Sequence, residues 1–276
     1  MRRIESIFHP SDFSEASEVA FEHALRIALV SKAEFTMLHV DSGYDADWAD
    51  FPGVRDTLER WGLILKGSDK SAVADLGIKV QKVIASNRSP VTASVDFLSK
   101  HPADLVVLAV HQYEGRVRWQ HKRVAEPIAH AAESMTLYLP YGVPGFVAHK
   151  DGAISLRKIL VPVTAKPRPE PAIEAVARMI RSLALPAGRV NLLHVGDAED
   201  MPPLQIPAEA DWEWTVHVLK GDPVEVIVQT AAAAGSDLVV MTTEGPHGFL
   251  DALRGNTAAR VLRSCRCPVL TLHAAP

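Results

Sequence analysis

The sequence predicts an α/β protein made of two tandem domains, each a doubly wound, five-stranded parallel sheet. Three observations support this fold class. Short β-branched runs alternate with helical patterns along the whole chain, as parallel sheets with crossover helices require. Uniformly apolar runs such as LVVLAV are typical of strands buried on both faces. Finally, the sequence motifs of the first half recur in the second half.

The repeat is clearest at two strand motifs. DLVVLAV begins at Asp104 and DLVVMTT at Asp237, 133 residues later. FTMLHV ends at Val40 and VNLLHV ends at Val195, 155 residues later. The second copy is therefore 22 residues shorter between its second and third strands. Residues 196–211 of that stretch contain three prolines, so we expect an extended crossover where the first copy has a helix.

In the first copy, the patterns place strands and helices in alternation. The expected strands are 4–9, 34–40, 78–84, 104–110 and 135–139. The expected helices are 14–31, 54–76, 89–101 and 120–132.

The second copy repeats this order with one helix fewer. The expected strands are 158–163, 189–195, 213–218, 237–242 and 268–272. The expected helices are 170–184, 222–235 and 256–265, the second opening on Asp222-Pro223, a favourable helix start. We place domain one at 1–143, a Gly-containing linker at 144–157, and domain two at 158–276.

Composition narrows the function classes. The chain has 276 residues, a formal net charge of −4 and 47% hydrophobic residues, which is ordinary globular composition. No global positive charge favours nucleic acid, and the longest apolar runs are strand-sized, so neither nucleic acid nor membrane is expected as a partner. With two cysteines and no apolar leader, we expect a cytoplasmic protein without a disulfide scaffold.

In an open parallel sheet, ligands bind beyond the carboxyl ends of the strands, where strand order reverses. The loops after strands one and four are therefore the candidates in each copy. In the second copy, the loop TTEGPHGFLDALRGNT carries Gly245, Gly248 and Gly255, which allow close backbone approach. A helix begins just after it, and free N–H groups at a helix start favour phosphate. Three loop glycines are also compatible with simple tight turns.

Both halves resemble universal stress protein domains. The resemblance is carried by HPSDFSEAS at the first strand end, LHV at both second strands, DLVV at both fourth strands and RGNTAARVLRSCRCPVLTL at the end. It implies a Rossmann-like fold of the adenine nucleotide alpha hydrolase type, with strand order 3-2-1-4-5. It also implies an adenine nucleotide such as ATP as the ligand, and pairing of the two halves as an intramolecular pseudo-dimer. A homodimer of two chains remains open.

Nucleotide-binding members of that family carry Gly-x2-Gly-x9-Gly-[Ser/Thr] after strand four and an Asp after strand one. The second copy aligns with the spacing kept, but Thr replaces the first Gly, Asn the hydroxyl residue and Thr the Asp. The resemblance implies backbone contact to the base at the end of the second strand. The implied site residues are Val163, Thr164, Val195, Thr242, Gly245, Gly248, Gly255, Asn256 and Thr257.

The first copy departs from the motif in the opposite way. Asp12 is present, but all three glycines are absent, and Lys122 and Arg123 stand at the third glycine and the hydroxyl residue. Its degenerate site would comprise Asp12, Val40, Lys122 and Arg123. Asp12 could bind a ribose or cap the helix expected from residue 14. The basic run 116–123 could bind phosphate, remain a solvated loop, or neutralise Asp12.

The remaining cysteines and histidines do not suggest a metal site. Cys265 and Cys267 could bind a metal with His247 or His273, but packed, reduced thiols are the favoured interpretation, and we predict no metal. His39 and His194 occupy equivalent strand ends and are expected to be structural.

No catalytic nucleophile motif is present, so we expect no enzyme. The leading hypothesis is a non-catalytic stress-response or signalling protein whose second domain binds adenine nucleotide weakly. The alternatives are a nucleotide-independent protein–protein interaction module and, less favoured, a slow ATP hydrolase.

Overall fold

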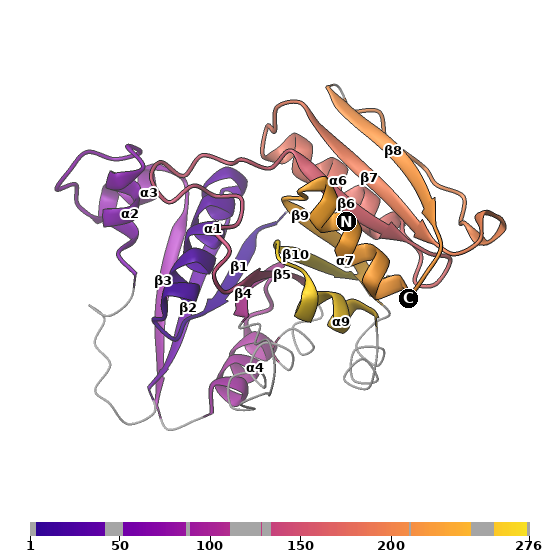
Figure 1. Ribbon diagram of the computed structural model, residues 1–276. Helices are drawn as coiled ribbons and strands as arrows, with labels where there is room; N and C mark the ends of the chain where they lie inside the picture. The colour runs from indigo at the N-terminus through magenta and orange to yellow at the C-terminus, as the bar shows by residue number, and fades with distance from the viewer. Residues whose placement is uncertain are drawn as a thin grey trace. The chain divides into compact units, whose positions relative to one another are not determined.

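The computed structural model describes residues 4–41, 52–86, 89–110, 128, 134–209, 211–243 and 257–274 (Figure 1). The chain divides into two compact units, Arg2–Ile154 and Ser155–Pro276. The division falls inside the stretch that the sequence suggested as a linker. Residues 144–154 belong to the first unit, so most of that stretch is part of a domain.

The first unit is built on five parallel strands in the order β3-β2-β1-β4-β5. Every strand lies within two residues of its expected position. The strands are β1 (Ser6–Pro10), β2 (Glu34–Asp41), β3 (Lys79–Ser86), β4 (Leu105–Val110) and β5 (Met135–Pro140). Strand order reverses at β1, which pairs with β2 on one side and β4 on the other. This is the order that the family resemblance implied.

The helices of the first unit connect these strands. They are α1 (Glu15–Ser31), α2 (Val54–Arg60), α3 (Lys70–Asp75) and α4 (Pro90–Lys100). The connection from β1 to β2 through α1 and the connection from β3 to β4 through α4 run in opposite directions across the sheet. Because both crossovers are right-handed, α1 and α4 lie on opposite faces. The expected helix 120–132 lies outside the described residues, apart from the buried Ile128.

One helix prediction is wrong. A single helix was expected over 54–76, but two short helices are found with a loop between them. Gly62 and Gly67 in that loop have φ values of +70° and +78°, which no helix residue adopts. Asp69 then accepts a hydrogen bond from the Ser71 amide and starts α3 afresh. The expected range is thus helical at its two ends, in α2 and α3, and not in the loop between them.

The second unit repeats the plan with the order β8-β7-β6-β9-β10. Its strands are β6 (Lys158–Val163), β7 (Gly188–Val195), β8 (Trp212–Leu219), β9 (Leu238–Thr243) and β10 (Val269–His273). Its helices are α6 (Glu170–Ser182), α7 (Pro223–Ala234) and α9 (Thr257–Ser264). Asp222 caps α7 by accepting hydrogen bonds from the Val224 and Glu225 amides, at 3.0 and 3.1 Å. Helices α7 and α9 pack against each other.

Between β7 and β8 the chain crosses without an α-helix in the described residues 196–209. Only a short 3-10 helix, η2 (Ala198–Asp200), interrupts an extended path. Pro202, Pro203 and Pro207 follow it. Proline lacks the N–H that a helix interior needs, so the path is extended for the reason given by the sequence.

The DLVV motifs hold the beginning of the first strand in each unit. Asp104 Oδ2 accepts hydrogen bonds from the Glu5 and Ser6 amides, at 2.8 and 2.9 Å. Asp237 Oδ2 accepts from the Arg157 and Lys158 amides, both at 2.8 Å. Charge-assisted bonds of this kind are stronger than neutral ones. The repeated Asp is therefore an anchor for the central strand.

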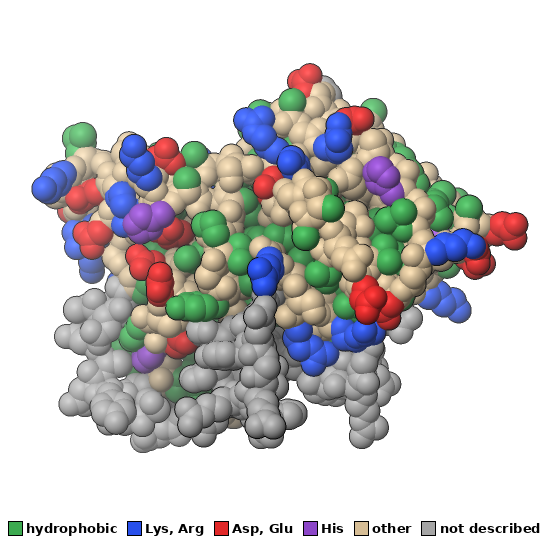
Figure 2. All heavy atoms as spheres, in the orientation of Figure 1, with side chains coloured by type: hydrophobic (Ala, Val, Ile, Leu, Met, Phe, Trp, Pro, Cys, Tyr) green, Lys and Arg blue, Asp and Glu red, His purple; other side chains and the backbone are tan. Residues whose placement is uncertain are grey.

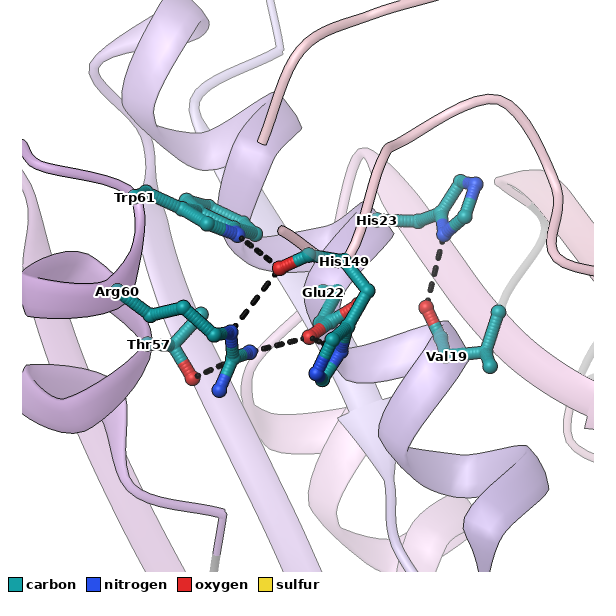
Figure 3. A network of polar contacts seen from close by, with 7 residues as sticks. All are labelled: Val19, Glu22, His23, Thr57, Arg60, Trp61 and His149. Carbon is teal, nitrogen blue, oxygen red and sulfur yellow. Dashed lines mark hydrogen bonds and ion pairs between the residues drawn. The ribbon is translucent and has the colours of Figure 1, made fainter. Parts of the chain in front are cut away.

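Residues 141–154 pack against α1 through a buried histidine (Figure 3). His23 Nδ1 donates to the Val19 carbonyl at 2.8 Å, and Nε2 accepts from the Phe146 and Val147 amides at 2.9 and 3.1 Å. Gly145 has φ +70° and passes so close that a Cβ would lie 2.3 Å from His23 Nε2. Burial lowers the pKa of His23 to about 4, so the ring is neutral, as an accepting Nε2 requires.

A polar cluster around Glu22, the residue before His23 on α1, also holds residues 141–154. The buried Glu22 Oε1 contacts Arg60 Nη2 at 2.5 Å and His149 Nδ1 at 2.7 Å. The His149 carbonyl accepts from Arg60 Nε and Trp61 Nε1, both at 3.0 Å. Burial raises the pKa of Glu22, while His149 and Arg60 act to lower it. Helix α2 thus bonds to residues 141–154 through α1 and directly, as Figure 3 shows.

Two further observations concern the surface. No helix among the described residues is both long and apolar enough to cross a membrane. Lysine, arginine, aspartate and glutamate side chains are interspersed on the face shown in Figure 2.

We expect acid to weaken the first unit through His23. Between pH 6.5 and about 4, the unfolded chain binds a proton at His23 that the folded protein does not. The free energy of unfolding should therefore fall with decreasing pH, by up to about 1.4 kcal/mol per pH unit. His23→Gln should remove this part of the slope in urea unfolding between pH 7 and 4.5.

His217→Gln is the matched control, because His217 is exposed on β8. The raised pKa of Glu22 changes the free energy of unfolding with pH in the opposite sense to His23. Glu22 is present in the wild type, His23→Gln and His217→Gln, so its contribution cancels when the three slopes are compared. If His23→Gln keeps the wild-type slope, protonation of His23 does not govern this stability.

Candidate functional site

The reversal of strand order opens both sheets at their carboxyl ends. β1 pairs with β4 only at Ile7–Leu105 and Phe8–Val106, although its pairing with β2 continues to Pro10. β6 and β9 likewise pair at two positions only, Ile159–Leu238 and Leu160–Val239. Beyond these pairs the central strand and strand four separate. A ligand in this type of fold enters at such a point.

Proline and histidine explain the separation in the first unit. The Ser11 amide bonds to the Leu38 carbonyl on the β2 side, so Pro10 faces β4, where it has no N–H to offer. The His9 ring instead donates from Nδ1 to the Val107 carbonyl at 2.9 Å. His9 is fully buried, its Nε2 has no partner among the described residues, and burial lowers its pKa. Pro162 occupies the equivalent place in the second unit.

The LHV motifs hold the carboxyl end of the central strand. His39 Nδ1 donates to the Ser11 carbonyl at 2.8 Å, and His194 Nδ1 donates to the Val163 carbonyl at 3.1 Å. In the second unit, His194 Nε2 also lies 3.1 Å from the Asp197 carbonyl. Gly196, at φ +153°, passes over this ring. Both histidines have the structural role expected from their equivalent positions.

In the first unit, Asp12 organises the start of α1. Its Oδ1 accepts from the Ser14 amide at 3.0 Å, the Ser14 hydroxyl at 2.5 Å and the Ser17 hydroxyl at 2.6 Å. Ser14 is the N-cap and accepts from the Ser17 amide at 3.2 Å. Asp12 therefore organises the loop that leads into α1 and supports the Ser14 cap, rather than capping the helix itself. Val40 is 9% exposed at the end of β2, on the same edge of the sheet.

In the second unit, four of the expected residues lie along the carboxyl edge. Val163 is buried at the end of β6, Thr164 is exposed just beyond it, and Val195 ends β7. Thr242 lies near the end of β9, and its Oγ1 is buried without a hydrogen-bond partner among the described residues. Thr257 begins α9.

The loop before α6 also differs from its counterpart in the first unit. Residues 164–169 separate β6 from α6, whereas residues 11–14 separate β1 from α1. The N-cap of α6 is Pro169, and no side chain caps that helix. The start of α6 thus lacks a side-chain acceptor like that of Ser14, and its Ala172 and Ile173 amides bond to the Pro169 carbonyl, both at 3.1 Å.

The remaining predicted residues lie outside the described part of the chain. These are Gly245, Gly248, Gly255, Asn256, Lys122 and Arg123. Their roles stay predictions.

Metal ligation was considered for two clusters. Glu18, Glu22 and His149 bring ligand atoms within 4.8 Å of one another, but Arg60 already neutralises Glu22 at 2.5 Å. A cation there would compete with the guanidinium. Cys265 and Cys267 are buried thiols, and His273 Nδ1 lies 3.3 Å from the Thr243 hydroxyl. His247 is outside the described residues.

Sequence analysis did not identify His9 or the Glu22–Arg60–His149 cluster. His9 could have been identified from the sequence. A histidine next to a proline in an apolar strand suggests that its ring makes a hydrogen bond to the neighbouring strand that the proline, without an N–H, cannot make. The cluster carries none, because its members are 38 and 89 residues apart along the chain.

We expect the support that Asp12 gives to the start of α1 to be measurable in stability. Asp12→Ala removes an acceptor used by the Ser14 and Ser17 side chains and should lower the free energy of unfolding by about 1–2 kcal/mol. Thr164→Ala is the matched control at the equivalent exposed position and should change it by less than about 0.5 kcal/mol. Equal effects in chemical denaturation would contradict the structural difference between the two strand ends.

Comparison with known proteins identifies the family. The family model described as "Universal stress protein family" matches residues 4–140 and 205–273. A universal stress protein of Methanocaldococcus jannaschii is 27% identical over 150 residues, covering 45% of this chain and 85% of that protein.

Solved structures show the same fold over nearly the whole chain. A universal stress protein from Archaeoglobus fulgidus has a TM-score of 0.63 at 17% identity, covering 98% of this chain and 97% of its own. A protein of unknown function from Pseudomonas aeruginosa has a TM-score of 0.60 at 14% identity, covering 98% and 93%. Since the family model matches more than half of the sequence, in both of its halves, this chain belongs to the universal stress protein family.

Proposed function

We propose that this protein is a non-catalytic stress-response or signalling protein whose second unit binds an adenine nucleotide weakly, at the opening between β6 and β9. The observation that carries the proposal is that the pairing of these strands ends at Leu160 and Val239, near the Thr242 hydroxyl, which is buried without a partner among the described residues. A buried polar group without a partner is costly, and a ligand would offset that cost.

The proposed contacts follow the edge of the sheet. The backbone at Val195 meets the base, with Val163 and Thr164 beside it. The loop glycines Gly245, Gly248 and Gly255, with Asn256 and Thr257, hold the phosphates. The start of α9, at Thr257, would support the phosphate contacts through its backbone amides. This part of the proposal rests on the motif spacing.

We assign no nucleotide to the first unit. Asp12 Oδ1 already accepts three hydrogen bonds from residues of the loop and of α1. In addition, Lys122 and Arg123 replace residues of the phosphate loop in the sequence. Slow ATP hydrolysis is the least favoured alternative, because the sequence motifs offer no general base to activate the attacking water.

Thr164→Asp tests the second-unit site directly. This substitution restores the carboxylate that nucleotide-binding members carry, and it should increase ATP affinity at least several-fold, as measured by calorimetric titration. Asn256→Ser should act in the same direction. ATP at ten times the dissociation constant should stabilise the folded protein by about 1.4 kcal/mol in thermal unfolding.

Asp12→Ala supplies the control for these titrations. It alters the equivalent position of the first unit and should leave ATP affinity unchanged. No carried nucleotide by native mass spectrometry, together with no thermal shift in millimolar ATP, would exclude nucleotide binding.

A second candidate function is protein–protein interaction, favoured by the surface of β8. This strand is at the end of the sheet order, and it exposes Val216, Val218 and Leu219 by 41%, 38% and 43%. Ile206, in the proline-rich crossover, is 43% exposed. Figure 2 shows hydrophobic side chains gathered over the region of β7 and β8. An unpaired strand edge with apolar side chains is suited to contact with another chain.

A second copy of this chain is the simplest partner to test. If β8 mediates self-association, Val216→Lys with Val218→Lys should abolish a concentration-dependent dimer in sedimentation velocity. His217→Lys, on the alternate face of the strand, is the control and should retain it. A wild-type protein that stays monomeric up to high micromolar concentration would rule out this form of the interaction. That the two units pair within one chain stays a prediction.

A further inference from the structure

The turn between α9 and β10 contains both cysteines of the chain. Cys265 follows α9 directly, and its amide bonds to the Val261 carbonyl at 2.8 Å. Cys267 precedes Pro268 and the start of β10. Both thiols belong to the hydrophobic core of the second unit, with 1% and 8% exposure. Ser264 and Arg266 are exposed, so the sulfur atoms lie just beneath the surface of the turn.

The two sulfur atoms are in contact. Cys265 Sγ and Cys267 Sγ lie 3.3 Å apart and share a hydrogen bond. A disulfide has a sulfur–sulfur distance of about 2.05 Å, so closing the bond requires a shift of little more than about 1 Å. Because one residue separates the cysteines, this shift stays within one turn and needs no movement of a domain.

The environment assigns different roles to the two sulfurs. A hydrogen bond from the Cys267 thiol, with further bonds from the backbone amides of Cys267 and Arg266, lowers the pKa of Cys265. The same hydrogen bond raises the pKa of Cys267. Thiolate is the reactive form of cysteine. Cys265 therefore suits the role of nucleophile, and Cys267, still protonated, suits that of the resolving thiol.

We propose that Cys265 and Cys267 form a reversible dithiol site that is oxidised by hydroperoxides to an intramolecular disulfide, in a turn where their sulfur atoms already touch. The site is separate from the candidate nucleotide site, and it requires no nucleotide.

The reaction balances in two steps. The Cys265 thiolate attacks hydrogen peroxide, so a sulfur–oxygen bond forms, the oxygen–oxygen bond breaks, and hydroxide leaves as water after taking a proton. Cys267 then attacks the sulfenic sulfur, so the disulfide forms and the hydroxyl group leaves as water with the Cys267 proton. In total, two thiols and one peroxide give one disulfide and two waters. A dithiol reductant reverses the change.

The result of an oxidation experiment can be assigned without ambiguity, because the sequence contains no cysteines besides these two. The purified full chain is treated with hydrogen peroxide, quenched with catalase, and analysed by intact mass and by thiol titration in denaturant. We expect the monomer to become about 2 Da lighter and its titratable thiols to fall from two to zero. Dithiothreitol should restore both thiols.

Two serine variants separate the roles. Cys267→Ser should stop at the sulfenic acid, about 16 Da heavier, and label with dimedone at Cys265. Cys265→Ser should react at least tenfold more slowly and give little adduct. Circular dichroism verifies that both variants are folded.

Three results would overturn the proposal. One is a wild-type protein that retains both thiols under conditions that oxidise free cysteine. Another is a disulfide that links two chains on a non-reducing gel. The third is Cys265→Ser labelling as fast as Cys267→Ser.

Discussion

The first strand of each unit is held at both ends by side chains from the repeated motifs, and the rest of the fold is arranged around it. At its start, Asp104 or Asp237 accepts two main-chain amides. At its end, His39 or His194 donates to the last carbonyl groups. The strand must pair on both sides, yet parallel strands cannot be joined by a short turn. The crossovers therefore leave in opposite directions, and an opening forms at the strand's carboxyl end.

The two units use this shared frame differently. In the first, Asp12 and the serines of the following loop satisfy the start of α1, and His9 bridges to β4. In the second, a longer loop leads to a helix with no side-chain cap, and the Thr242 hydroxyl is buried without a partner among the described residues. Each unit keeps one buried polar atom without a partner among the described residues, His9 Nε2 in the first and Thr242 Oγ1 in the second. The units differ in that Asp12 is engaged by its own loop and by α1, whereas the equivalent Thr164 is exposed. That asymmetry is why the binding hypothesis favours the second unit.

Contacts between distant residues add features that the repeat does not contain. Glu22 and His23 on α1 bind residues 146–149, a stretch that resembled a linker in sequence. Glycines permit that close path, so their presence alone could not distinguish a flexible linker from a tightly packed strap. In the turn that holds Cys265 and Cys267, the sequence did show that the two residues are near each other along the chain. The contact between their sulfur atoms, however, depends on how α9 and β10 meet.

By itself, the sequence determined the two-domain α/β fold, the position of every strand within two residues, and the extended crossover before β8. These follow from local rules: apolar runs, proline chemistry and the repeat. It predicted one continuous helix over residues 54–76 where the structure has two short ones, because Gly62 and Gly67 in the middle of that range adopt positive φ. Only the tertiary structure decided that Asp12 supports the Ser14 cap of α1, that His9 replaces a main-chain bond and that residues 144–154 belong to the first unit. Each of these depends on which groups meet across the fold, where burial fixes hydrogen-bond partners that sequence separation does not reveal.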